Sequence, residues 1–152
     1  YSGYLNITSS IDGETRQMYY LFMEVIPDPA RNISSSSAPV ILCTGNGPGG
    51  STQSYNYMET GPFTIRLGGT WTQNNFTYNN RANLLYVDMP AGVGFSIDYE
   101  LDGTEWTDEI TTEINYKFLK KFPKVEGVGS DLKSKYQRKT SFLNRSRLDL
   151  DS

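Results

Sequence analysis

The segment Leu84-Leu85-Tyr86-Val87-Asp88-Met89-Pro90-Ala91-Gly92-Val93-Gly94-Phe95-Ser96 decides the fold of this chain of 152 residues. Its first four residues are continuously apolar, which is typical of a short strand buried on both faces of a sheet. Pro90 and the two glycines after it end the strand and turn the chain. We therefore expect a buried strand that runs into a corner, with the Phe95 side chain packed beneath that corner.

A second short apolar run, Val40 to Cys43, indicates another strand buried on both faces. It leads into the turn Gly45-Asn46-Gly47-Pro48-Gly49-Gly50. Glycines there let the backbone approach a ligand and leave N–H groups free to point at a negative oxygen. A tight loop without a ligand explains the same residues, whereas a nucleotide-phosphate loop is disfavoured because no Gly-Lys-Ser or Gly-Lys-Thr follows. Cys43, the one cysteine, cannot form an intramolecular disulfide and is interpreted as a small buried apolar side chain.

Two further segments complete an α/β pattern. Residues 19–26 are rich in aromatic and branched side chains and end at Pro27, which predicts a strand. Before Pro123 the sequence predicts a helix, capped by Thr107 or Asp108. Its apolar stripe has a spacing of about four residues and consists of Ile110, Ile114, Phe118, Leu119 and Phe122. Buried strands, a glycine turn and a helix in this order favour an α/β layer architecture.

The composition changes after the predicted helix begins. Residues 1–115 hold four basic and thirteen acidic side chains, whereas residues 116–152 hold ten basic and four acidic ones. Residues 125–152 have no sustained hydrophobic period, and we interpret them as an unmatched basic tail, irregular or mis-framed. No stretch has the roughly 18 to 20 apolar residues of a membrane-spanning helix. The sequence starts at Tyr1, so we expect any targeting segment to have been removed or to lie outside it.

Four tripeptides fit the N-glycosylation pattern and favour the secretory pathway, with a lysosomal, vacuolar or extracellular destination. They begin at Asn6, Asn32, Asn75 and Asn144.

The motifs occur in an order that resembles the N-terminal part of the serine carboxypeptidase family, which includes the carboxypeptidase Y and cathepsin A types. The similarity extends over residues 1–124. It rests on these segments: Tyr1 to Leu5, Tyr20 to Phe22, the glycine turn at 45–50, Glu59 to Phe63, Trp71, Asn83 to Asp88, Pro90 to Ser96, and Phe118 to Pro123.

This resemblance implies a partial α/β-hydrolase fold made of the N-terminal strands, the oxyanion loop and the first helix, with the rest of the sheet missing. The family removes the last residue of peptides with a Ser-Asp-His triad and an oxyanion hole. We accordingly expect a peptide substrate, and no nucleic acid, metal or cofactor.

The family's oxyanion hole uses the backbone N–H of the glycine before the proline in its glycine turn, which corresponds to Gly47. The family turn reads Asn-Gly-Gly-Pro-Gly-Cys-Ser-Ser, and its Asn helps to hold the substrate's terminal carboxylate. Gly45 and Asn46 stand there in swapped order, and Gly50 replaces a disulfide-forming cysteine. Glu59 matches the acidic residue of a Glu-x-Gly-Pro motif, and it either contacts substrate or orients the adjacent loop.

Asp88 resembles the family's strand-end Asp, which is not the triad member. A nucleophile elbow, Gly-x-Ser-x-Gly, should follow the helix. Ser130, in Gly129-Ser130-Asp131, lacks the flanking strand and the second glycine. The sequence also contains no histidine, so no imidazole can activate a serine. We therefore expect none of the triad to be present and the chain alone to be inactive.

Three interpretations stay open. The first is a truncated or mis-framed product of a serine carboxypeptidase gene, which translation of the downstream DNA in three frames would test. The second is a non-catalytic binding or decoy module derived from a carboxypeptidase. The third is a fragment of a family acyltransferase that uses the same triad to acylate small alcohols.

Overall fold

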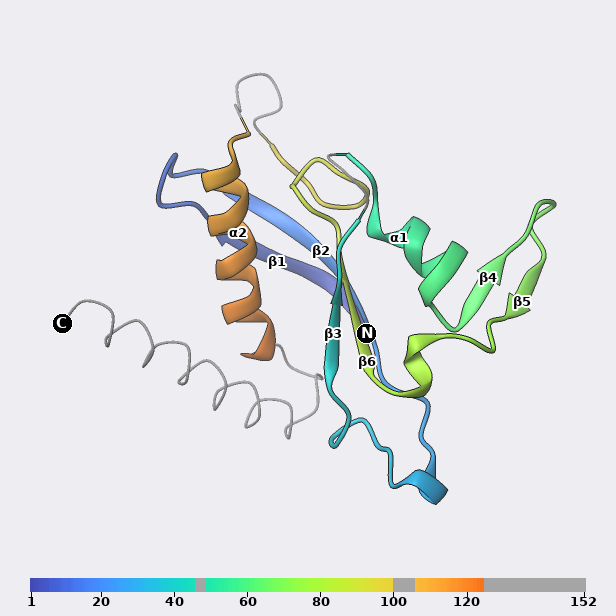
Figure 1. Cartoon of the computed structure of the whole chain (residues 1–152). Coiled ribbons are helices and arrows are strands. Elements are labelled where there is room, and N and C mark those ends of the chain that lie inside the picture. The colour runs from blue at the N-terminus through green and yellow to red at the C-terminus, as the bar shows by residue number, and fades with distance from the viewer. Residues whose placement is uncertain (46–48, 100–105, 125–152) are drawn as a thin grey trace.

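The computed structural model describes residues 1–45, 49–99 and 106–124. Its main sheet has the strand order β1–β2–β6–β3 (Figure 1). The bounds are Ser2–Thr8 for β1, Thr15–Met23 for β2, Val40–Cys43 for β3 and Asn83–Val87 for β6. β2 pairs antiparallel with both β1 and β6, whereas β3 runs parallel to β6.

A smaller hairpin, β4 Phe63–Ile65 and β5 Trp71–Gln73, lies apart from this sheet. The helical elements are the 3-10 turn η1 Pro29–Arg31, α1 Thr52–Tyr55, the π-helical segment η2 Asn56–Thr60, the 3-10 turn η3 Tyr78–Asn80, α2 Asp108–Lys121 and the 3-10 turn η4 Phe122–Lys124. Among the described helices, none has the length and apolar character needed to cross a membrane.

α2 covers one face of the sheet and was predicted correctly. The Thr107 hydroxyl accepts a hydrogen bond from the Ile110 N–H at 3.3 Å and caps the helix. Its apolar stripe packs into the main core, which contains Ile7, Met18, Tyr20, Phe22, Leu85, Val87, Ala91, Ile110, Ile114, Phe118 and Phe122. The spacing of about four residues thus places one helix face against β1, β2 and β6.

α1 and η2 lie on the opposite face of the sheet (Figure 1). Because side chains alternate along a strand, Leu85 and Val87 of β6 face α2, whereas Leu84 and Tyr86 face the other way. Cys43 is half-buried, packs beside Leu84 and Tyr86, and has a thiol pKa raised by burial.

Two strand predictions were wrong in part. The strand predicted at residues 19–26 is β2, which begins at Thr15 and ends at Met23. Its polar first residues pair with β1, and its chain leaves the sheet before Pro27. β3 is not buried on both faces: Ile41 and Leu42 each keep 37% of their surface exposed. Within the described residues β3 is the edge strand, so no neighbouring strand covers its outer side.

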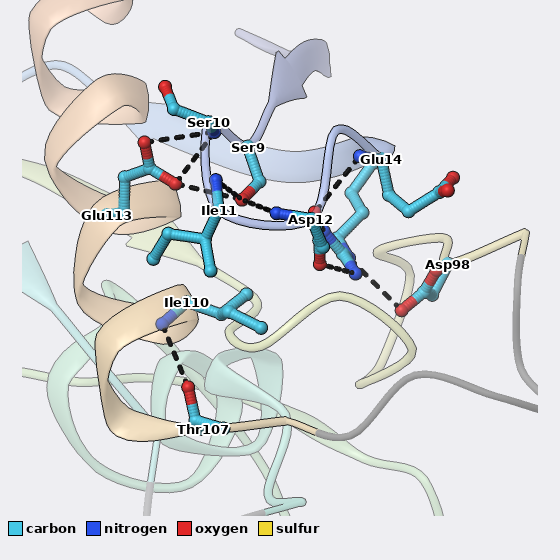
Figure 2. Close-up of polar contacts among 10 residues, drawn as sticks. Ser9, Ser10, Ile11, Asp12, Glu14, Asp98, Thr107, Ile110 and Glu113 are labelled. Carbon is cyan, nitrogen blue, oxygen red and sulfur yellow. Dashed lines mark hydrogen bonds and ion pairs between the residues drawn. The ribbon is translucent and has the colours of Figure 1, made fainter.

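The β1–β2 turn is held to α2 by polar contacts (Figure 2). The Glu113 carboxylate accepts hydrogen bonds from the Ser9 hydroxyl at 2.8 Å and from the Ser10 N–H at 3.0 Å. Lys117 lies 2.8 Å from the same carboxylate and also donates to the Thr8 carbonyl. The hydrogen bond from Lys117, followed by those from Ser10 and Ser9, lowers the pKa of Glu113 from 4.5 to about 2.

Glu113 should therefore make the chain acid-sensitive. Its folded-state pKa is depressed, so its stabilising effect is complete above the unfolded pKa of 4.5 and is lost as the pH falls towards about 2. We expect Glu113→Gln to flatten the fall in Tm across this window, measured by thermal melts at stepped pH. Glu109→Gln, on an exposed carboxylate of the same helix with a smaller downward pKa shift, is the control. An unchanged pH profile for Glu113→Gln would contradict the assignment.

Candidate active site: the glycine turn and its carboxylate support

The two glycine motifs leave the sheet at the same end. β3 and β6 are parallel and in register, with Cys43 opposite Tyr86. The glycine turn follows β3 and Asp88 follows β6, so the segments meet beyond the carboxyl ends of both strands. In α/β sheets this end of parallel strands is where ligands bind.

Asp88 joins the two segments through a fully buried carboxylate. Its Oδ1 accepts hydrogen bonds from the Ser51 hydroxyl at 2.9 Å, the Thr52 N–H at 2.7 Å and the Thr52 hydroxyl at 2.7 Å. Its Oδ2 accepts from the Phe95 N–H at 3.0 Å. Both oxygens of the buried charge are thereby satisfied, and the end of the glycine turn is fixed to the loop after β6.

A second layer of contacts holds this loop to β2. The Ser96 hydroxyl donates to the Asp88 carbonyl at 2.7 Å and accepts from the Tyr19 N–H at 2.8 Å. Phe95 is not packed beneath the corner, as the sequence suggested, but keeps 58% of its surface exposed. Its backbone N–H faces Asp88, which directs its ring outward against Tyr19, with 5.1 Å between ring centroids.

The described residues at the two ends of the glycine turn, Gly45 and Gly50, lie in close contact. A Cβ added to Gly45 would lie 2.2 Å from the Gly50 carbonyl oxygen, so only glycine fits there. Gly47 and Asn46 lie outside the described residues, and so does Asn144. Glu59, in η2, has an exposed side chain, and its backbone carbonyl accepts a hydrogen bond from Asn74 at 2.8 Å. The structure therefore leaves both interpretations of Glu59 open.

Gly94 tests how tightly the corner is packed. Its φ is +59°, and an added Cβ would lie 2.3 Å from Asp88 Oδ2 and 2.7 Å from Ser51 Oγ. We expect Gly94→Ala to lower the free energy of unfolding by about 2–4 kcal/mol, from left-handed backbone strain plus overpacking. Gly68→Ala is the matched control, since φ is +91° there but no atom lies within 4 Å of the added Cβ. Urea denaturation showing equal losses for both variants would contradict the close packing.

The sequence alone did not reveal that Asp88 contacts Ser51, Thr52 and the Phe95 N–H. The available signal was a carboxylate directly after one buried strand and hydroxyl side chains directly after the glycine turn of its parallel neighbour. No group of three or more His, Cys, Asp or Glu side chains within the described ranges could hold a metal ion.

Comparisons with known proteins show the family of this chain. The family model described as serine carboxypeptidase matches residues 1–127. Serine carboxypeptidase-like 38 of Arabidopsis thaliana is 36% identical over 138 residues, which is 84% of this chain and 26% of that protein. The lysosomal protective protein of Mus musculus is 38% identical over 124 residues, 80% of this chain and 23% of that protein.

A solved structure shows the same fold. It is a prohormone-processing carboxypeptidase, Kex1(Δ)p from Saccharomyces cerevisiae, with a TM-score of 0.59 and 21% identity over 81% of this chain and 28% of that one. The chain is thus an α/β protein with a mixed sheet. It belongs to the serine carboxypeptidase family. It spans about a quarter of the length of the relatives it matches.

Proposed function

We propose that this chain supplies the oxyanion-loop part of a serine-type carboxypeptidase, which removes C-terminal residues from peptides, and that it is inactive alone. The buried Asp88 carboxylate carries the proposal, because its hydrogen bonds to Ser51 and Thr52 fix the end of the glycine turn. A turn that presents an N–H to a developing oxyanion must be held before the reaction starts. In this proposal Gly47 is that donor, and it contributes about 3–4 kcal/mol when a triad is present.

Gly45, Asn46 and Glu59 form the proposed region for the substrate's terminal carboxylate. The swapped order of Gly45 and Asn46 removes the family's amide from its usual position and puts a side chain at the next one. We therefore propose that this turn holds the carboxylate weakly.

We also propose that residues 1–124 are the carboxypeptidase-like part and that residues 125–152, which lie outside the described residues, are a basic tail. The chain would pass through the secretory pathway to a lysosome, vacuole or the outside of the cell. The side chains of Asn6, Asn32 and Asn75 are exposed and therefore accessible to glycosylation.

A chimera tests the proposed function. We would replace the matching segment of a complete serine carboxypeptidase with residues 1–127 and measure release of the last residue from N-blocked dipeptides. The chimera should be active, whereas purified residues 1–152 should release nothing above background. Because Gly45 and Asn46 replace the family's Asn-Gly pair, the chimera should have a kcat/KM roughly 10–100-fold below that of the parent enzyme, the effect of a lost hydrogen bond to a charged group.

Two results would contradict the proposal. A folded chimera without activity would show that this turn is no oxyanion hole, and activity of the purified chain alone would show that the missing triad is not needed. An amidated substrate given to both the chimera and the parent enzyme is the control, because without the terminal carboxylate the difference between the two enzymes should vanish.

A further inference from the structure

The inner face of α1 and η2 is polar along its whole length. Thr52, Gln53 and Asn56 are buried, with 0%, 7% and 1% of their surfaces exposed. Their spacing of three and four residues places them on the side of the helix that packs towards β6. At one end of this row Thr52 donates to Asp88, and at the other end the Thr60 hydroxyl lies 2.9 Å from the Tyr86 hydroxyl.

The two amides in the middle of this row are unsatisfied. Gln53 Nε2, Asn56 Nδ2 and Asn56 Oδ1 are buried without a hydrogen-bond partner among the described residues. Buried amides in native proteins are nearly always hydrogen-bonded to protein or to ordered water. Two such side chains, one turn apart and flanked by satisfied hydroxyl groups, therefore require a partner that the described residues do not supply.

The local backbone fixes the position of Asn56. The helix widens here, and the Gly61 N–H donates to the Asn56 carbonyl at 3.0 Å, five residues back. A Cβ added to Gly61 would lie 2.1 Å from Asn56 Oδ1, so the side chain is pressed against a position that only glycine can occupy. Asn56 therefore has little freedom to turn its amide towards another protein group.

From these contacts we propose that the interface between α1–η2 and β6 encloses a bound water molecule that bridges the side-chain amides of Gln53 and Asn56. A buried water typically makes about three hydrogen bonds and is found where polar groups have no other partner. The water accepts from Gln53 Nε2 and bonds to the amide of Asn56, and the neighbouring hydroxyls of Thr52 and Thr60 keep the site polar. It links α1 to η2, and it does not depend on the proposed function.

Water-contact NMR on the full 152-residue chain tests the proposal directly. Uniform ¹⁵N labelling resolves the side-chain amide protons, and a long-lived water should give cross-peaks of slow-tumbling sign to both Gln53 and Asn56. Absence of these cross-peaks, their presence for only one of the two side chains, or amide exchange as fast as in a free peptide would overturn it.

A double-mutant cycle gives an independent measurement. Gln53→Met or Asn56→Leu alone leaves the other amide without its bridging water, and each should lower Tm by roughly 3–8 °C. The double variant removes both polar groups and should melt within about 3 °C of the wild type, because replacing both partners by apolar groups is nearly neutral. Single substitutions that each raise Tm, with effects that add in the double variant, would show that the amides are independent and no water is shared.

Discussion

Replacing Arg16 with methionine is expected to lower the free energy of unfolding by about 3–5 kcal/mol, because it removes one partner of a buried ion pair. The Arg16 side chain has no exposed surface, and its Nε lies 3.3 Å from Asp98 Oδ2, on a carboxylate that is only 2% exposed. Its two terminal nitrogens donate to Asp12 at 3.2 and 2.8 Å, and its guanidinium lies 4.7 Å from the centre of the Trp106 ring. Burial by itself would lower the pKa of Arg16, but the hydrogen bonds to Asp12 and Asp98 raise it overall.

The loss should be large because Arg16 connects three separate segments. Asp12 belongs to the β1–β2 turn, and Asp98 follows the corner after β6 (Figure 2). Trp106 precedes α2 in the sequence. Without the guanidinium, the nearly buried Asp98 carboxylate loses its ion pair with Arg16. Asp12, whose pKa Arg16 helps to lower to about 2, is more exposed and should adapt.

Arg31→Met is the control for this experiment. Arg31 also pairs with an aspartate, Asp28, at 3.3 Å, but its side chain is 58% exposed. Exposed ion pairs contribute about 0–1 kcal/mol, so urea denaturation should show a small change. If Arg16→Met cost no more than Arg31→Met, the buried pair would not stabilise this fold. Adding Asp98→Asn to Arg16→Met should recover part of the loss, since it removes the charge left behind.

The difference between α2 and Arg16 shows what could be predicted from the sequence. α2 was predicted with its cap and buried face because the signals lie within a few residues of each other: Thr107, the spacing from Ile110 to Phe118, and Pro123. The burial of Arg16 depends on Asp98, 82 residues away, and nothing local distinguishes it from a surface arginine. The exposed edge of β3 was missed for the same reason, because burial of a strand depends on its neighbours.

The candidate site lies between these two cases. The glycine turn and the strand-end Asp88 were identified from local motifs, and their resemblance to the serine carboxypeptidase family agrees with the family match over residues 1–127. The hydrogen bonds between them join residues 36 and 37 positions apart, so only the parallel pairing of β3 with β6 brings them together. The roles of Gly47, Gly45, Asn46 and Glu59 stay predictions for the chimera to test.

Asp88→Ala is expected to cost about 3–5 kcal/mol of unfolding free energy. The substitution leaves four donors, from Ser51, Thr52 and Phe95, without their acceptor in a buried corner, and each buried unpaired donor costs about 1–3 kcal/mol before relaxation. In Asp88→Asn the side chain keeps one acceptor oxygen, but an NH2 group replaces the other oxygen and faces a hydrogen-bond donor. The loss of unfolding free energy in this variant should therefore be about half as large.

Hydrogen exchange at the Thr52 and Phe95 amides should accelerate in both variants, while the amide of Ile110 in α2 should change only as far as global stability does. Asp108→Ala, at an exposed position in the first turn of α2, serves as the control and should cost no more than about 1 kcal/mol. Unchanged exchange at Thr52 in Asp88→Ala would mean that the carboxylate does not hold the end of the glycine turn, and the turn would then lack the fixed support that an oxyanion donor requires.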